Sequence, residues 1–317
     1  MINSLQNKNT FVTLIMTVLV CLTPTLMASE PGDETVSTRA LGIEKLSDEY
    51  LKLKDQLRNN HDQFVLISNM ADDRSYGDVF GIINYPLEQT RDMLVYSSKW
   101  CNAAILHINV KSCVTDNLNK GNATVKLFVG DEDYLEPDDA NLFQYHYQVD
   151  NTSTGYIRAA LHADSGPLDT KQHQLTIEII QINDTSSFVH YAYSADFGFI
   201  TRAVLNTYLS TIGRHKVGFS NHGVDKDGNP QFITGIAGIM ERNSMRYFFA
   251  FSSYLYGLNF PEEQRFYISM NHWFNYTEKY KRQLYEVKRT QYLDTKSQEY
   301  RNQLTLQVAN KDTTAIP

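Results

Sequence analysis

The middle of the chain is a series of short segments in which apolar and polar residues alternate, and this series constrains the fold more than any other feature. Six such segments lie between residues 105 and 196, separated by turn-rich stretches such as DNLNKGN and DEDYLEPDD. Two shorter runs, at 64–68 and 78–84, precede them. A period of two is typical of strands that bury one face, so the pattern predicts an antiparallel meander. Another apolar layer must cover one face of that sheet.

Helical patterns follow the strands and can supply this cover. Residues 199–212 carry an apolar stripe at helical spacing that includes Leu205, Tyr208 and Leu209. A hairpin and a second helix at 241–257 come next, and a helical tail rich in tyrosine and mixed charge then ends near residue 303. We therefore expect an α+β protein in which the two helices lie over the sheet.

Residues 1–28 have the layout of a secretory signal peptide. Lys8 precedes an apolar run at 11–22, which is too short for a membrane-spanning helix, and Pro24 to Ala28 supply the break before cleavage. An uncleaved anchor is the alternative. Cleavage predicts an exported protein, periplasmic in a Gram-negative host and otherwise secreted.

The chain is predicted to hold one main domain with a packed tail. The expected parts are a signal peptide at 1–28, an N-terminal arm at 29–61, a ligand-binding domain at 62–258, a helical tail at 259–303 and a disordered C-terminus at 304–317.

Composition and cysteine content bound the function. Because 42% of the residues are apolar, the chain can bury a sizeable core, and its formal net charge of −7 argues against nucleic acid as a partner. Export would leave two cysteines, Cys101 and Cys113. In an oxidising compartment they are expected to form a disulfide, and two buried free thiols are the alternative.

The order of these elements resembles the START/Bet v 1-like helix-grip superfamily, also called SRPBCC. The resemblance is carried by a first strand that ends in GDVFGIINYP, a short helical pair through LEQTRDMLVYSSKWCNAA, the antiparallel strands and a long helix from Phe199. It covers about residues 62–258, and the hairpin after the long helix and the C-terminal helical extension depart from the minimal plan. The resemblance implies a curved sheet that grips a long helix and a cavity that holds an apolar molecule.

Two groups of residues are candidates for the polar part of such a cavity. His107, Asn109 and Lys111 alternate along the strand expected from Ile105, where they face either solvent or the cavity. Arg214, at the end of the first helix, and Glu241 with Arg246, in the second, form either a structural ion-pair network or a site for an anionic head group.

No motif for a metal, a nucleotide or a nucleophilic serine is present, so neither a cofactor nor a catalytic centre is predicted. The favoured function is binding or carriage of a small hydrophobic molecule, lipid or isoprenoid-like, with transient membrane contact as a further expectation. A cyclase or dehydratase that uses His107 or Glu241 as acid or base is one alternative. A ligand-free interaction module is the other.

Overall fold

The computed structural model describes residues 40–59, 63–71, 73–116, 122–211 and 213–314. The expected signal peptide lies outside these residues and stays a prediction. The described residues belong to one compact unit that begins at Thr38. Among their helices, none is both long enough and apolar enough to cross a membrane.

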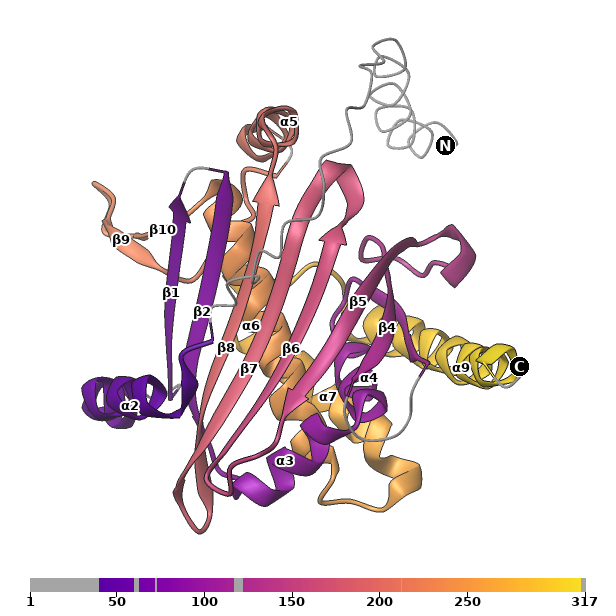
Figure 1. Cartoon of the computed structure of the whole chain (residues 1–317). Coiled ribbons are helices and arrows are strands. Elements are labelled where there is room, and N and C mark those ends of the chain that lie inside the picture. The colour runs from indigo at the N-terminus through magenta and orange to yellow at the C-terminus, as the bar shows by residue number, and fades with distance from the viewer. Residues whose placement is uncertain (1–39, 60–62, 72, 117–121, 212, 315–317) are drawn as a thin grey trace, which may run out of the picture. The chain divides into compact units, whose positions relative to one another are not determined.

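The core element is an antiparallel sheet of eight strands that bends without closing into a barrel (Figure 1). In spatial order its strands are β1 (Phe64–Ala71), β2 (Arg74–Ile83), β8 (Ser186–Phe197), β7 (Thr170–Asn183), β6 (Tyr156–Ser165), β5 (Asn141–Asp150), β4 (Ala123–Val129) and β3 (Val110–Thr115). Single 3₁₀ turns at Pro137–Asp139 and Pro167–Asp169 precede β5 and β7. The predicted α+β class and the antiparallel meander are confirmed.

The strand expected to begin at Ile105 begins five residues later. Helices α3 (Leu87–Val95) and α4 (Ser97–Ala104) follow β2, and α4 runs on into tight turns: the Ile105 N–H bonds to the Cys101 carbonyl at 3.1 Å. Ile105, Leu106 and Ile108 are buried by these turns. In these residues, apolar and polar side chains alternate as they do in a strand, but the backbone forms turns.

The helix that covers the sheet is α6 (Gly235–Gly257), which lies behind the strands in Figure 1. Two glycines on one face of β2 allow α6 to lie close to the sheet. A Cβ at Gly77 would lie 2.5 Å from Ser244 Oγ, and one at Gly81 would lie 2.5 Å from the ring of Phe248. Because residues four apart on a strand share a face, this pair makes a shallow track for the helix.

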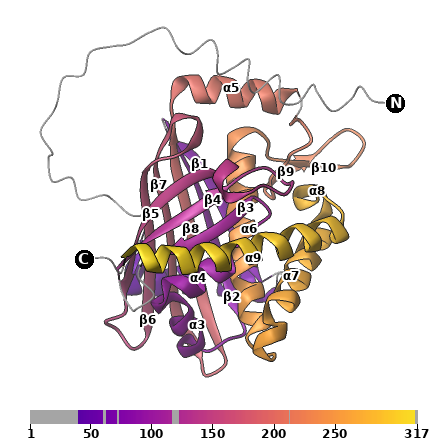
Figure 2. The same ribbon diagram turned by 90° about the vertical axis from the view of Figure 1, so that its right-hand side faces the viewer.

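A helix does begin at Phe199, as predicted, but it is not the long helix that covers the sheet. Helix α5 (Phe199–Ser210) is short and lies at the end of the strands (Figure 2), where it contacts the start of α6. Only Gly198 separates it from β8, so the chain has no room to turn back over the sheet at this point. The hairpin of β9 (Asn221–Val224) and β10 (Pro230–Phe232), which confirms the predicted hairpin, lies on the path that returns the chain to the sheet.

The tail is helical and packs on the rest of the unit. It consists of α7 (Glu262–Lys279), α8 (Lys281–Leu284) and α9 (Arg289–Thr314). Since α9 continues to Thr314, the expected disordered segment from residue 304 is wrong for the part that the structure describes. Figure 2 shows α9 running along the β3 side of the sheet.

Helix α9 covers the open edge of β3 with polar side chains. Lys296 Nζ donates to the Val110 carbonyl at 2.6 Å, Gln303 Oε1 accepts from the Cys113 N–H at 2.9 Å, and Gln307 bonds to both the N–H and the carbonyl of Thr115. These residues follow one another at intervals of seven and four, which places them on one side of the helix. They satisfy backbone groups that an edge strand leaves unpaired.

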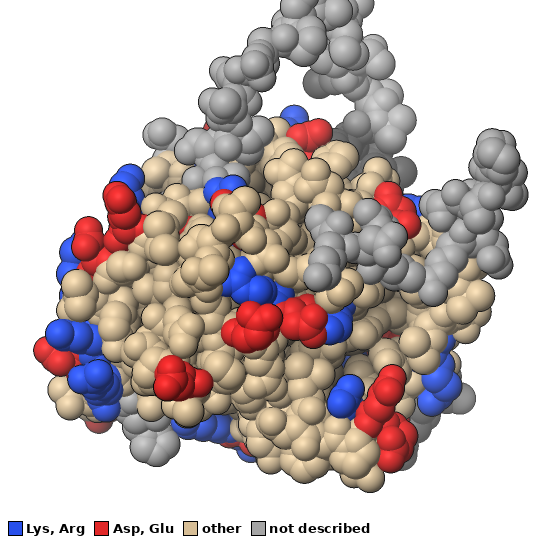
Figure 3. Space-filling model, turned by 60° about the horizontal axis from the view of Figure 1, so that its bottom comes forward, with Lys and Arg blue, Asp and Glu red and all other residues tan. Residues whose placement is uncertain are grey.

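The outer face of the sheet is partly covered by α2 (Gly42–Asn59), where Leu46 and Leu57 pack with Phe80 and Phe188. On the described surface that Figure 3 presents, Lys and Arg side chains alternate with Asp and Glu side chains, and no continuous basic patch forms there.

Candidate functional site

A cavity of about 170 Å³ lies between the inner face of the sheet and α6. Its wall is formed by the end of α4 and the turn after it, by four strands and by α6. The lining residues are Trp100, His107, Asn109, Leu127, Val129, Gly130, Phe143, Tyr145, Leu175, Tyr193, Asn243 and Tyr247.

Aromatic side chains make up much of this wall. Phe143 and Tyr145 stand two residues apart on β5 and so share a face, and Asn243 and Tyr247 stand one turn apart on α6. The cavity residues of β5, β8 and α6 were not among the sequence candidates. The available signal was the aromatic residue at every second position of the β5 segment, which a solvated strand does not need.

His107 is a buried residue of the cavity wall. Its Nδ1 accepts a hydrogen bond from the Asn109 N–H at 3.1 Å, and its ring is tilted against that of Tyr247 with centroids 4.4 Å apart. Burial, together with the nearby charges of Arg246 and Lys296, holds the pKa of His107 well below its usual range. The ring is therefore neutral, and because Nδ1 is the acceptor, Nε2 carries the proton. Nε2 has no hydrogen-bond partner among the described residues.

The solvent-facing alternative for His107, Asn109 and Lys111 is wrong. His107 and Asn109 line the cavity, and Lys111 is fully buried behind it. Asn109 Nδ2 donates to the Gly130 carbonyl at 3.0 Å, while its Oδ1 accepts from Arg246 Nη1 at 3.4 Å. Asn109 therefore links the cavity wall to a cation behind it.

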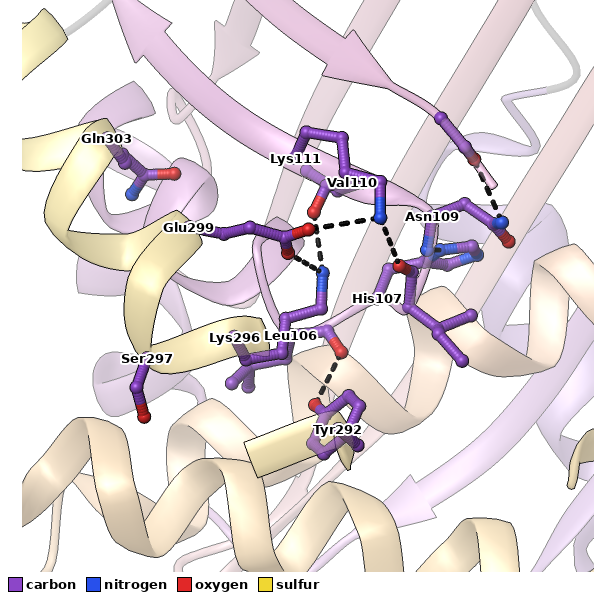
Figure 4. A network of polar contacts seen from close by, with 12 residues as sticks. Leu106, His107, Asn109, Val110, Lys111, Tyr292, Lys296, Ser297, Glu299 and Gln303 are labelled. Carbon is purple, nitrogen blue, oxygen red and sulfur yellow. Dashed lines mark hydrogen bonds and ion pairs between the residues drawn. The ribbon is translucent and has the colours of Figure 1, made fainter. Parts of the chain in front are cut away.

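Lys111 belongs to a buried group of three charges shown in Figure 4. Its Nζ donates to Glu299 Oε1 at 3.0 Å, and Lys296 Nζ donates to Glu299 Oε2 at 2.7 Å. All three side chains are fully buried. Burial lowers the pKa of Lys296 to about 8, against the opposing effect of Glu299. The turn that holds His107 is thus fixed to α9 by ion pairs.

The predicted ion pair of Glu241 with Arg214 or Arg246 does not form. Glu241 instead accepts from Ser68 Oγ at 2.6 Å and from the N–H groups of Phe219 and Ser220, which ties β1 and the loop before β9 to α6. Arg246 pairs with Glu286 at 2.8 Å. Arg214 is exposed and donates to the neighbouring His215.

The three candidates on α5 lie outside the cavity wall. Leu209 packs with Phe197, Ile236 and Met240 at the end of the sheet, Leu205 is half-buried, and Tyr208 is exposed. The cavity was expected between the sheet and both helices, and its wall includes residues of α6 but none of α5.

The disulfide between Cys101 and Cys113 is present and joins α4 to β3, with Cα atoms 5.1 Å apart. It encloses the turn that carries His107 and Asn109. Among the described residues, no three His, Cys, Asp or Glu side chains gather closely enough to hold a metal ion.

The element order, with a short helical pair after the second strand and a long helix across one face of a bent antiparallel sheet, resembles that of the START-like helix-grip fold. No protein-family model matches the chain. No curated protein matches it in sequence either.

Solved structures similar to the chain include a conserved protein from Geobacillus kaustophilus, human STARD10 and the ZhuI aromatase/cyclase from Streptomyces sp. R1128. Their sequence identities to the chain are 16%, 12% and 8%, and their TM-scores are 0.30, 0.30 and 0.31. The matches cover 44%, 58% and 65% of this chain and 85%, 78% and 94% of the respective structures.

Proposed function

We propose that the protein binds a small, mainly apolar molecule of about one ring in the cavity under α6, with an acceptor atom of that molecule placed against His107 Nε2. One observation carries the proposal: an aromatic-walled space of about 170 Å³ to which a buried histidine without a partner for its Nε2 contributes. A buried N–H without a partner costs about 1–3 kcal/mol, so a ligand that accepts from it gains that energy back.

The volume sets the size of the ligand. An engineered cavity of about 150 Å³ in another protein holds benzene, whereas pockets for drug-sized ligands measure about 300–1,000 Å³. The cavity therefore suits a ring with a short substituent better than an entire phospholipid. A longer lipid or isoprenoid-like chain would need α6 or the β3–β4 side of the sheet to move.

The contacts favour binding over acid or base catalysis. Glu241, the expected carboxylate acid or base, already accepts three hydrogen bonds away from the cavity. His107 already uses Nδ1 as an acceptor, so it offers the cavity a donor and no free base. Export into an oxidising compartment is part of the proposal, and the disulfide supports it.

Calorimetric titration with acetophenone and with ethylbenzene tests the proposal. The two probes have similar shapes, but only acetophenone carries a carbonyl oxygen for His107. We expect both to bind, and acetophenone more tightly by roughly fivefold, which is the usual worth of one hydrogen bond. His107→Phe should remove the difference between the two probes.

A filled cavity supplies the matched control. Leu175→Trp places extra volume in the wall and should abolish binding of both probes. Leu304→Trp makes the same change on the exposed side of α9, where the wild-type side chain is 50% exposed, and should leave binding intact. If neither probe binds the wild-type protein, the proposal is wrong.

A further inference from the structure

Cations outnumber carboxylates behind the polar end of the cavity. Five basic side chains and two acidic ones form two groups there, and five of the seven are buried. The groups are Arg242, Arg246 and Lys216 around Glu286, and Lys111 and Lys296 around Glu299.

In the first group, three cations share one carboxylate. Glu286 Oε1 accepts from Arg246 Nη2 at 2.8 Å, from Arg242 Nη2, and from Lys216 Nζ at 3.4 Å. Burial alone would raise the pKa of Glu286, but the three cations lower it to about 2. Even with Glu286 fully ionised, this group keeps an excess of positive charge.

The excess positive charge lies next to two residues of the cavity wall, Asn109 and His107. Arg246 Nη1 contacts Asn109 Oδ1, and Arg246 Nε has no partner among the described residues. Burial is the main cause of the low pKa of His107, and Arg246, Lys296 and Lys111 add to it because they too oppose a proton there, whereas Glu286 favours one. Glu241, the other acid on this part of α6, is engaged by Ser68 and two backbone N–H groups.

We propose that the cavity selects ligands whose polar end is an acidic oxygen, such as a phenol, enol or carboxyl group, and binds them as the oxyanion. This inference rests on the proposed function, because it names the class of ligand for that site. The oxyanion would accept from His107 Nε2, and a charged acceptor strengthens that hydrogen bond. The cations behind Asn109 are held in place before the ligand arrives, so they need not reorganise.

Two effects on a bound phenol oppose each other. Burial in an apolar cavity raises the pKa of a phenol, whereas nearby fixed cations lower it. We expect the effect of the cations to dominate because they outnumber the carboxylates. Most of them are also shielded from water, and charge interactions are screened least in such a buried environment.

The test uses 4-nitrophenol, whose phenolate absorbs visible light, and 4-nitrotoluene, which fills nearly the same space without an ionisable group. We expect the pKa of 4-nitrophenol to fall by about one unit on binding, which is a roughly tenfold preference for the phenolate. The measurement is a pH titration of its absorbance with the wild-type protein in excess.

Three variants distinguish the effect of the cations near the cavity from the effect of removing a positive charge anywhere on the protein. Arg246→Gln should reduce the pKa shift of the probe, and Lys216→Gln, at a half-buried position that disturbs packing less, should reduce it in the same direction. Lys171→Gln removes an equal charge at a site that is 61% exposed and should leave the shift unchanged.

Failure of this inference differs from failure of the proposed function. If 4-nitrotoluene binds but the pKa of bound 4-nitrophenol stays level or rises, the site takes neutral ligands and the inference is overturned. If neither probe binds, both proposals are overturned.

Discussion

His190 lies on the opposite face of the sheet from the cavity, between two carboxylates. Its Nδ1 is 2.9 Å from Glu178 Oε2 and its Nε2 is 2.9 Å from Asp78 Oδ1. Glu178 also accepts from the N–H groups of Leu41 and Gly42, where α2 begins. Burial alone would lower the pKa of His190, but the two carboxylates outweigh burial and raise it. The ring is thus a buried cation that holds the start of α2 through Glu178.

A histidine whose pKa is raised by folding stabilises the protein most at low pH. Its contribution is fully present below the unfolded pKa of about 6.5 and is lost as the pH rises through the folded pKa. We expect His190→Gln to lower the free energy of unfolding by about 3 kcal/mol at pH 6, because two buried carboxylates lose their cation. The difference from wild type should shrink toward pH 9 in urea unfolding.

Tyr156→Phe is the control for this pH dependence. It removes one hydrogen bond to Glu178, at 2.7 Å, without removing a charge. It should cost about 1 kcal/mol at both pH values. A pH-independent cost for His190→Gln would show that His190 is neutral in the folded protein.

Individual buried polar residues were the hardest to predict. Glu178 and His190 are partners on the consecutive strands β7 and β8, but Asp78 on β2 is 112 residues from His190, so no spacing in the sequence reveals that contact. His107 was chosen because it alternates with apolar residues, and it does reach the cavity. His107 lies on a turn and not on a strand, and the sequence around it does not show that its neighbours lie on α6 and α9.

At the scale of elements, α9 and β3 depend on each other. We expect Gln303→Leu to leave the Cys113 N–H unpaired in the core and to lower the free energy of unfolding by about 1–3 kcal/mol. Leu304→Gln, on the exposed side of the same helix, should change it by less than about 0.5 kcal/mol. Urea unfolding measures both, and equal effects would contradict the role of Gln303 as a partner for the strand edge.

The sheet and the helix at 241–257 that covers it could be predicted from the sequence, whereas the position of α5 beyond the end of the strands could not. Alternation identified most strands because a sheet with one buried face imposes that period on each of them. An apolar stripe, in contrast, shows that a helix has a buried face but does not show which element that face packs against. Both α5 and α6 carry apolar residues, and the difference lies in the length of the connection before each and in the glycine track at Gly77 and Gly81.

At the scale of the whole molecule, the disulfide supports both stability and the site. A loop of this length contributes about 3 kcal/mol by the loop-entropy relation. We expect the double variant Cys101→Ala, Cys113→Ala to unfold more easily by about 2–4 kcal/mol and to bind acetophenone more weakly, since the enclosed turn carries His107. Urea unfolding and calorimetry measure these effects.

Thiol titration of the unfolded, unreduced protein is the companion measurement. Blocked thiols at both positions are expected. Two reactive thiols would show that the bond does not form in the isolated protein, and the stability difference should then vanish.

The contacts between β3 and α9 have a consequence for the order in which the chain is made. Tyr292 bonds to the Leu106 carbonyl 186 residues earlier, and Lys296 to Val110 at the same separation. While the chain is being synthesised, the edge of β3 therefore stays open until residues 296–307 exist, and open edges can pair with other strands. A chain that stops before Tyr292 would keep every cavity residue and still lack Glu299, the partner of Lys111. The proposed binding site thus gains the ion pair behind its wall only after Glu299 has been synthesised.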